Sequence, residues 1–236
     1  MARQLAKMNF YVVLGCRDEE RGQAAGERLR REQLDGAAIP LDITDERTIA
    51  SASDWVRENG GALDVLINNA GVNLQRAPAS QTDMSLLRAT YETNFFGVVA
   101  LTKAMLPALL KAPAGRIVNV SSTLGSLTLQ SDARGEFGGM KWLTYCSSKA
   151  ALNAATVFFA SELTHTPVKI NSAPRVLFNR HEWRPRKPVP GRGRSGGSEA
   201  CHSGSGWSHG RFLWHNISHL HHVHSSPDRQ SRDHVT

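Results

Sequence analysis

Short apolar runs alternate with amphipathic segments along the first 173 residues of the chain. Branched and aromatic residues fill the runs at 10–16, 37–43, 64–70, 115–122 and 168–173, which predicts buried strands there. Apolar residues recur at helical spacing in 18–33, 44–59, 82–111 and 147–163, and residues 2–8 read as the end of a further helix. Strands that alternate with helices predict an α/β fold with a doubly wound parallel sheet.

Two of these helices begin with capping signals. Asp18 precedes the helix predicted from its own position onward, and its carboxylate suits the unpaired N–H groups of a first turn. Thr44 is predicted to cap the next helix, whose first-turn residues Asp45 and Glu46 suit the helix dipole.

Tyr145 and Lys149 are the polar pair with the clearest chemical meaning. Four residues apart at the start of a predicted helix, they lie on one helical face, one turn apart. A nearby ammonium favours the ionised phenol, so Lys149 is expected to lower the pKa of Tyr145 from about 10. Such a Tyr can exchange a proton with a substrate oxygen. An exposed Tyr and Lys on an ordinary helix would show the same spacing.

Further polar residues end or interrupt the neighbouring elements. The predicted strand 115–122 ends in Ser122, and open α/β sheets bind ligands at the carboxyl edge where such a hydroxyl lies. The strand 64–70 leads into Asn68-Asn69-Ala70-Gly71. Asn94 lies inside a long apolar helix, where a buried amide needs partners and a bond within the helix would also satisfy it.

This order of a strand with Asn-Asn-Ala-Gly, a helical Asn, a strand with Ser122 and a Tyr-x-x-x-Lys helix resembles the short-chain dehydrogenase/reductase family over about residues 2–173. The resemblance implies a Rossmann-like fold and hydride transfer between a nicotinamide cofactor and a carbonyl carbon. It implies that Tyr145 is the general acid or base and that Ser122 hydrogen-bonds the substrate oxygen. Lys149 would lower the pKa of Tyr145 and hold the nicotinamide ribose.

The resemblance also implies cofactor contacts and a proton relay. Asn94 would position a water that relays protons through Lys149. Asn68, Ala70 and Gly71 would line the adenine-ribose side of the cofactor, and Asp42 would face the adenine.

Arg17 indicates the form of the cofactor. It follows the strand 10–16, at the point where dinucleotide folds meet the adenosine ribose. An acidic residue there would bind the 2′-hydroxyl, whereas an Arg offers a charge-assisted contact to a 2′-phosphate. We therefore expect NADP(H), with the alternative that Arg17 is a solvated loop residue paired with Asp18.

The segment between Ser122 and Tyr145 is longer than the family's usual spacing. The inserted residues 127–144 resemble the monomeric carbonyl-reductase branch, in which an added segment covers the surface used elsewhere for oligomerisation. That resemblance implies a monomer and a small carbonyl substrate, which would be a ketone, an aldehyde or a quinone.

The chain departs from the family pattern at both ends. The family opens with a strand and a glycine-rich turn that holds the cofactor pyrophosphate, and neither is found before residue 10. We expect the missing central strand to leave a gap with unpaired backbone groups between the strands 10–16 and 64–70. Such a chain is expected to show no measurable NADPH-dependent reduction. The alternative reading is a non-catalytic remnant that binds no cofactor.

Beyond residue 173 the composition changes. The first 172 residues carry 18 basic and 17 acidic side chains, so most of the net charge of +7 belongs to the remainder. We predict a partial Rossmann-like domain at 1–173 and a disordered basic tail at 174–236, rich in His, Ser and Gly and arising from a shifted reading frame or another alteration.

The tail contains motifs that chance explains better than chemistry. Gly191, Gly193 and Gly196 follow a proline-rich stretch and not a strand. Its histidines, from His219 to His224, have no framework that would fix a metal geometry, so no metal site is predicted. Its arginines could contact polyanions only weakly, so no nucleic-acid partner is expected.

Three cysteines without disulfide or metal spacing favour a reducing compartment. The longest apolar stretch, from Phe95 to Leu110, is interrupted by Lys103 and Pro107 and fits a buried helix, so no membrane span is expected. A cytoplasmic location follows as an expectation.

Overall fold

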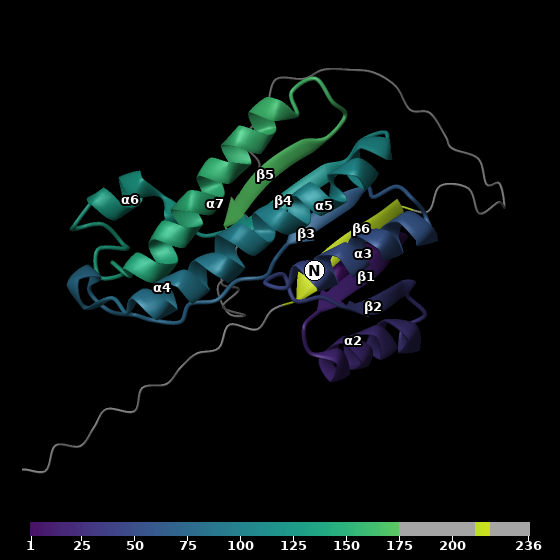
Figure 1. The fold of residues 1–236 in the computed structure, drawn as a ribbon, viewed down its shortest axis with the longest axis horizontal. Helices are drawn as coiled ribbons and strands as arrows, with labels where there is room; N and C mark the ends of the chain where they lie inside the picture. The colour runs from purple at the N-terminus through teal and green to yellow at the C-terminus, as the bar shows by residue number, and fades with distance from the viewer. Residues whose placement is uncertain (175–210, 218–236) are drawn as a thin grey trace, which may run out of the picture.

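The computed structural model describes residues 1–174 and the backbone of residues 211–217 (Figure 1). The helices and strands are α1 (Ala2–Ala6), β1 (Phe10–Cys16), α2 (Glu19–Arg31), β2 (Gly36–Pro40), α3 (Glu46–Asn59), β3 (Val65–Asn68), η1 (Ala79–Gln81), α4 (Met84–Tyr91), η2 (Glu92–Phe96), α5 (Gly97–Lys111), β4 (Arg116–Ser121), η3 (Thr123–Gly125), α6 (Leu127–Ser131), α7 (Leu143–Glu162), β5 (Lys169–Pro174) and β6 (Arg211–Ile217). Each predicted strand and helix is present, with ends shifted by a few residues.

The described strands form one parallel sheet in the order β2-β1-β6-β3-β4-β5. Helices cover both of its faces, so the predicted doubly wound α/β fold is confirmed. The alternation of side chains along each strand explains how one sheet has two cores, because successive residues point to opposite faces.

One core lies between the sheet and α3, α5 and α7. Its strand residues are Val13, Leu66, Ile117 and Ile170, and its helix residues include Leu101, Met105 and Leu152. The second core lies under α1 and α2 and takes the alternate strand positions, among them Val12, Leu14, Ile67 and Val120. The near-continuous apolar runs of the sequence therefore reflect strands that are buried on both faces.

The sheet has no gap at the predicted central position. Strand β6 lies between β1 and β3, in register with Phe10–Cys16 on one side and Val65–Ile67 on the other (Figure 1, yellow strand). The prediction of a structureless tail is therefore wrong for residues 211–217. The prediction failed because the apolar run Phe212-Leu213-Trp214 is too short to show the period of a strand. The segment forms a strand through its pairing with β1 and β3. The motifs at Gly191–Gly196 and His219–His224 lie outside the described residues.

The helix starts follow the predicted capping chemistry with one correction. The side chain of Asp18 accepts a hydrogen bond from the N–H of Arg21, 3.0 Å away, and caps α2 as predicted. Asp45, and not Thr44, caps α3, because the N–H and hydroxyl of Thr44 both donate to Oδ1 of Asp42. Thr44 thus closes a turn one residue before the helix begins.

The long predicted helix is continuous from Met84 to Lys111 but widens at η2, a π-helical segment. This stretch is long and apolar enough to cross a membrane by composition alone. Leu101, Met105 and Leu109 are fully buried against the sheet, so core packing accounts for much of its hydropathy.

We predict that Leu101→Ala lowers the free energy of unfolding by about 2–5 kcal/mol, because it opens a cavity in the larger core. Leu110→Ala is the matched control on the same helix: Leu110 is 43% exposed, and its loss should cost under about 0.5 kcal/mol. Urea titrations of both variants measure the difference. Equal midpoints would contradict the assigned core face of α5.

Candidate active site

Lys149 and Tyr145 lie on one face of α7, as their spacing predicts. Lys149 is 3% exposed, and its ammonium donates a hydrogen bond of 2.9 Å to the carbonyl oxygen of Val120, near the end of β4. The same ammonium lies 5.9 Å from the centre of the Tyr145 ring. A buried cation is costly unless it is hydrogen-bonded, so the bond to β4 fixes the amine beneath the phenol at the carboxyl edge of the sheet.

Asn94 fastens α7 to the segment that follows β3. It is fully buried, and its amide donates 2.9 Å hydrogen bonds to the carbonyl of Val72 and to Oγ of Ser148. Its carbonyl oxygen accepts from the N–H of Val72 at 2.8 Å. Asn94 lies in the π-helical segment η2, which is the kind of helix widening found at functional sites. The side chain of Asn94 thus joins η2, the segment after β3 and α7. Its role in positioning a water for proton relay stays a prediction.

Ser148 is a site residue that sequence reasoning missed. Its hydroxyl accepts from Asn94 and donates to the carbonyl oxygen of Tyr145, 2.8 Å away. The serine lies between the two motif residues and is fully buried. Only its position next to Lys149 could have signalled it, and the spacing of Tyr145 and Lys149 says nothing about the residues between them.

Ser122 follows the last residue of β4 at the same edge, as predicted. Its half-buried hydroxyl accepts a hydrogen bond of 3.2 Å from the N–H of Leu124, and so begins η3. A hydroxyl has one donor and a second lone pair besides this contact. Gly125 lets η3 pack on α7, since a Cβ there would stand 2.8 Å from the carbonyl carbon of Lys149. This close packing sets the position of Ser122 relative to α7.

The Asn68–Gly71 segment divides between core and site. Asn68 is 1% exposed and donates to Thr102 and Asn119. Ala70 is also buried. Gly71 lies beside the Lys149–Asn94 group, where a Cβ would come within 3.2 Å of the ammonium and 3.4 Å of the Asn94 amide oxygen. The structure therefore brings Gly71 to the predicted catalytic residues, while Asn68 braces the strands beneath them.

Arg17 and Asp42 lie on the other half of the sheet, beyond the ends of β1 and β2. Arg17 is exposed and makes no ion pair with the described residues, whereas Asp18 pairs with Arg21 at 3.3 Å. The alternative in which Asp18 neutralises Arg17 is thus not the arrangement found. Oδ1 of Asp42 accepts both bonds of the Thr44 turn, so this carboxylate has a structural role at the same edge.

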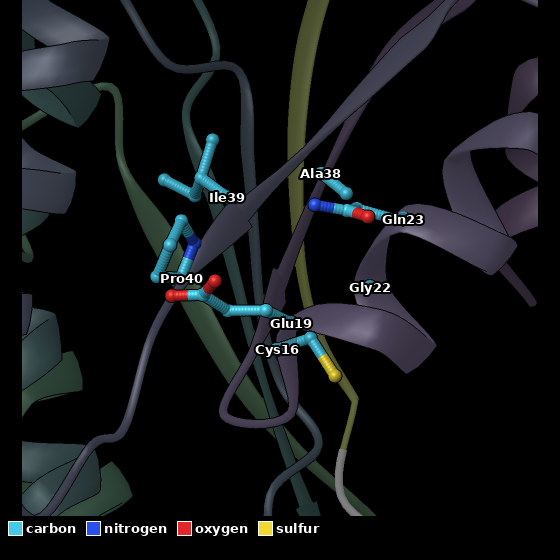
Figure 2. Close-up of a pocket in the computed structure, with 7 residues that line it drawn as sticks. All are labelled: Cys16, Glu19, Gly22, Gln23, Ala38, Ile39 and Pro40. Atoms are coloured by element: carbon cyan, nitrogen blue, oxygen red, sulfur yellow. The ribbon is translucent and has the colours of Figure 1, made fainter.

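A small pocket with a cavity volume of about 70 Å³ opens between β1, β2 and α2. Cys16, Glu19, Gly22, Gln23, Ala38, Ile39 and Pro40 line it. Figure 2 shows Glu19 and Gln23 extending from α2 across the pocket toward β2. Gly22 keeps α2 close to β1, because a Cβ there would stand 3.2 Å from the Cβ of Cys16. The pocket therefore lies at the carboxyl ends of β1 and β2, where an open sheet binds ligands.

The inserted segment covers the side of the site next to Tyr145. Its residues include α6, and its last residues bond the loop after β3: the hydroxyl of Thr144 donates to the carbonyl of Gln75 at 2.9 Å. The guanidinium of Arg76 lies 4.9 Å from the centre of the Trp142 ring, a cation–π contact. Together these contacts tie the insertion to the segment that Asn94 also holds.

The thiol of Cys146, next to Tyr145, is half-buried and raised in pKa by desolvation. It donates to the carbonyl of Met140 and accepts from Gln130. A raised pKa keeps the thiol neutral until higher pH.

We predict that iodoacetamide alkylates Cys146 slowly at pH 7. The pH at which alkylation reaches half of its maximal rate should lie above the pKa of about 8.5 for free cysteine. Mass spectrometry over a pH series measures this, with glutathione as the control; a midpoint below that of glutathione would contradict it.

We predict that Asn94→Leu lowers the free energy of unfolding by about 2–5 kcal/mol, because it removes the partners of both backbone groups of half-buried Val72 and of the fully buried Ser148 hydroxyl. Asn59→Leu is the matched control, since Asn59 is exposed and bonds only its own helix at Trp55 among the described residues. Denaturant melts of the two variants compare them. A cost for Asn94→Leu no larger than that for Asn59→Leu would show that the clamp contributes nothing.

Comparisons with known proteins give the context for this arrangement. The family model for short chain dehydrogenases matches residues 1–175. The chain is 34% identical to the short-chain dehydrogenase anuI of Penicillium roqueforti over 69% of this chain and 66% of the relative. It is 42% identical to human carbonyl reductase [NADPH] 1 over 51% of this chain and 42% of the relative. The chain thus spans 66% and 42% of the lengths of these two relatives.

A solved structure supports the same fold. The NADPH-bound carbonyl reductase from chicken fatty liver superimposes with a TM-score of 0.60 at 25% sequence identity. The similarity covers 72% of this chain and 73% of that one.

Proposed function

The chain belongs to the short-chain dehydrogenase family, and from that premise we propose that it is an NADP-dependent reductase of a small carbonyl compound. The observation that carries the proposal is the group at the end of β4: a buried ammonium, Lys149, held under Tyr145 and beside Gly71. The names of the relatives, with carbonyl reductases from human and chicken among them, support the carbonyl substrate.

The residues present suit the nicotinamide end of such a cofactor. The ammonium of Lys149 bonds the carbonyl of Val120, and an ammonium is also a suitable donor to the hydroxyls of a ribose. Gly71 provides an opening without a side chain next to that ammonium, which allows a ligand close approach. Bound there, the cofactor would supply the hydride.

The pyrophosphate end has no such support among the described residues. In this fold the pyrophosphate lies against a glycine-rich turn that follows the central strand. Here the central strand is β6, and the described residues contain no turn after it. No described residue is therefore assigned to the pyrophosphate.

The proton chemistry is assigned to residues of α7 and β4. The phenol of Tyr145 would give its proton to the carbonyl oxygen of the substrate, or take it back in the oxidative direction. The positive charge of Lys149 favours the phenolate that this transfer leaves. The hydroxyl of Ser122 would hydrogen-bond the same oxygen and stabilise the charge that develops on it. Asn94 and Ser148 position these groups, because they hold the first turn of α7 to η2 and to Val72.

The choice of cofactor rests on Arg17. Arg17 is exposed and directly follows Cys16, which lines the pocket at the ends of β1 and β2, and Asp18 is paired with Arg21. A 2′-phosphate there would find a bidentate cation. The carboxylate of Glu19 lines the same pocket and opposes a phosphate, so the preference for NADPH depends on the balance of these two side chains.

The cofactor-free remnant is not favoured. That reading rested on a missing glycine turn and on a gap in the sheet, and β6 fills the gap. The intact group of Asn94, Ser122, Tyr145 and Lys149 supports an enzyme. A monomeric state and a cytoplasmic location remain predictions from the sequence, as does the absence of membrane and nucleic-acid partners.

The sequence alone led us to expect no measurable reduction, but β6 fills the gap on which part of that expectation rested. We therefore predict that purified chain at millimolar NADPH reduces a ketone, and that Tyr145→Phe lowers kcat by about 100-fold or more through loss of the proton donor. Tyr91→Phe is the matched control, because the Tyr91 ring packs against the rings of Phe95 and Phe96. Absorbance at 340 nm measures turnover, and circular dichroism checks the fold. Equal kcat values for Tyr145→Phe and wild type would refute the assignment.

We predict that Arg17→Asp shifts the ratio of kcat/KM for NADPH over NADH by about 10–100-fold toward NADH, the value of one charge-assisted contact. Glu19→Gln should shift the ratio the other way, because it removes the opposing charge from the pocket. Arg30→Asp, a similar charge change on an exposed residue near the end of α2, is the control. If Arg17→Asp and Arg30→Asp give the same ratio, Arg17 does not select the cofactor.

A further inference from the structure

Among the described strands, β6 alone joins the two halves of the sheet by backbone pairing. β1 pairs with it from Phe10 to Cys16, and β3 pairs with it from Val65 to Ile67. β1 and β3 are not neighbours. Without β6, each of them would present a row of N–H and C=O groups to an open slot at the centre of the sheet (Figure 1).

That slot lies between the two hydrophobic cores. Val13 and Leu66 face the core under α3 and α5, whereas Val12 and Ile67 face the core under α1 and α2. Unpaired backbone groups in such surroundings cost as much as lost hydrogen bonds, because water does not replace the partner. The slot therefore favours an extended segment that runs parallel to both neighbours and is apolar on both of its faces.

The middle of the segment 211–217 has that character, whereas Arg211, His215 and Asn216 in the same strand are polar. A strand buried on both faces in a parallel sheet reads as a near-continuous apolar run, and Phe212-Leu213-Trp214 is such a run. In register, Leu213 stands between Val12 and Val65, and Trp214 stands between Val13 and Leu66. Residues 175–210 connect β5 to β6 in the sequence. Because this connection is long, it does not by itself force β6 to pair with β1 and β3.

We propose that the slot between β1 and β3 is a strand-binding site whose occupant is residues 211–217 of the same chain, and that it accepts the same strand from a separate peptide. The slot would recognise an extended segment that has free backbone donors and acceptors and three consecutive apolar side chains. Binding adds a parallel strand inside a sheet, a form of β-augmentation. The proposal does not depend on the activity proposed above.

Other contacts hold the two halves together when the slot is empty. α3 packs on α5 across the larger core. At Gly97 the start of α5 lies so close to Ile43 that a Cβ would stand 2.4 Å from its carbonyl oxygen. A variant that loses β6 therefore keeps a framework that a peptide can re-enter.

Hydrogen exchange of the full chain tests the cis occupant. Amides of residues 212–217 should be protected to the same degree as those of Val12–Leu14 in wild type. Their protection should not depend on protein concentration. Exchange at residues 212–217 as fast as in an unstructured peptide would overturn the proposal. Protection that rises with concentration would overturn the intramolecular occupant in favour of a second copy.

Leu213→Pro tests the slot itself, since proline removes an N–H and does not fit a central strand. Amides of Val12–Leu14 and Val65–Ile67 should exchange about tenfold faster or more, while those of β4 and β5 change little. Ser203→Pro, outside β6, is the control and should match wild type. Wild-type exchange rates in Leu213→Pro would overturn the proposal.

A synthetic peptide covering residues 209–219 completes the test. Added to Leu213→Pro, it should restore protection at Val12–Leu14 and Val65–Ile67, and a peptide of scrambled sequence should not. If Leu213→Pro loses the helical circular dichroism signal, hydrogen exchange cannot serve as the readout. Recovery of the circular dichroism signal on addition of the peptide is then the measurement. Failure of the peptide to restore either signal at millimolar concentration would refute binding in trans.

Discussion

The pairing of backbone groups at the centre of the sheet is the constraint on which the rest of this structure depends. β1 and β3 lie between two cores, and neither can leave its inner edge bare without burying unpaired N–H and C=O groups. β6 satisfies both edges at once. Because the strands are parallel and in register through β6, their carboxyl ends reach one common edge, and the candidate site can extend across it.

A second constraint operates within the site. An ammonium that is 3% exposed requires hydrogen-bond partners, and the carbonyl of Val120 supplies one at 2.9 Å. The Asn94 amide then joins η2, Val72 and Ser148, and Ser148 in turn bonds the carbonyl of Tyr145. The two residues with assigned chemistry are thus fixed by partners on separate elements. Proton transfer needs such fixed geometry, because a general acid acts only within hydrogen-bond reach of its target.

The sequence predicted those parts of the fold and site that depend on local pattern. The alternation of apolar runs gave each strand from β1 to β5, and the spacing of Tyr145 and Lys149 placed both on one face of α7. Parts that depend on distant partners could not be predicted. Strand β6 exists through the edges of β1 and β3, and Ser148 became a site residue through a bond to Asn94, 54 positions earlier.

The cap of α3 shows the same limit on a smaller scale. Thr44 and Asp45 are both good capping residues, so sequence preference could not separate them. The carboxylate of Asp42 decides the matter, because it accepts both donors of Thr44 and leaves Asp45 to begin the helix.

The two halves of the sheet carry different parts of the proposed function. Asn94, Ser122, Tyr145 and Lys149 all come from elements on the β3–β5 side, and the bonds of Asn94 to Val72 and Ser148 and of Lys149 to Val120 lie within that side. Arg17 and the pocket lined by Cys16 belong to the β1–β2 side, which, among the described strands, β6 joins to the first. Geometry for proton transfer is therefore local to one half. The spacing between that geometry and Arg17, the residue proposed to select the cofactor, depends on the central strand. On that proposal, β6 matters more for cofactor affinity and selection than for the chemical step.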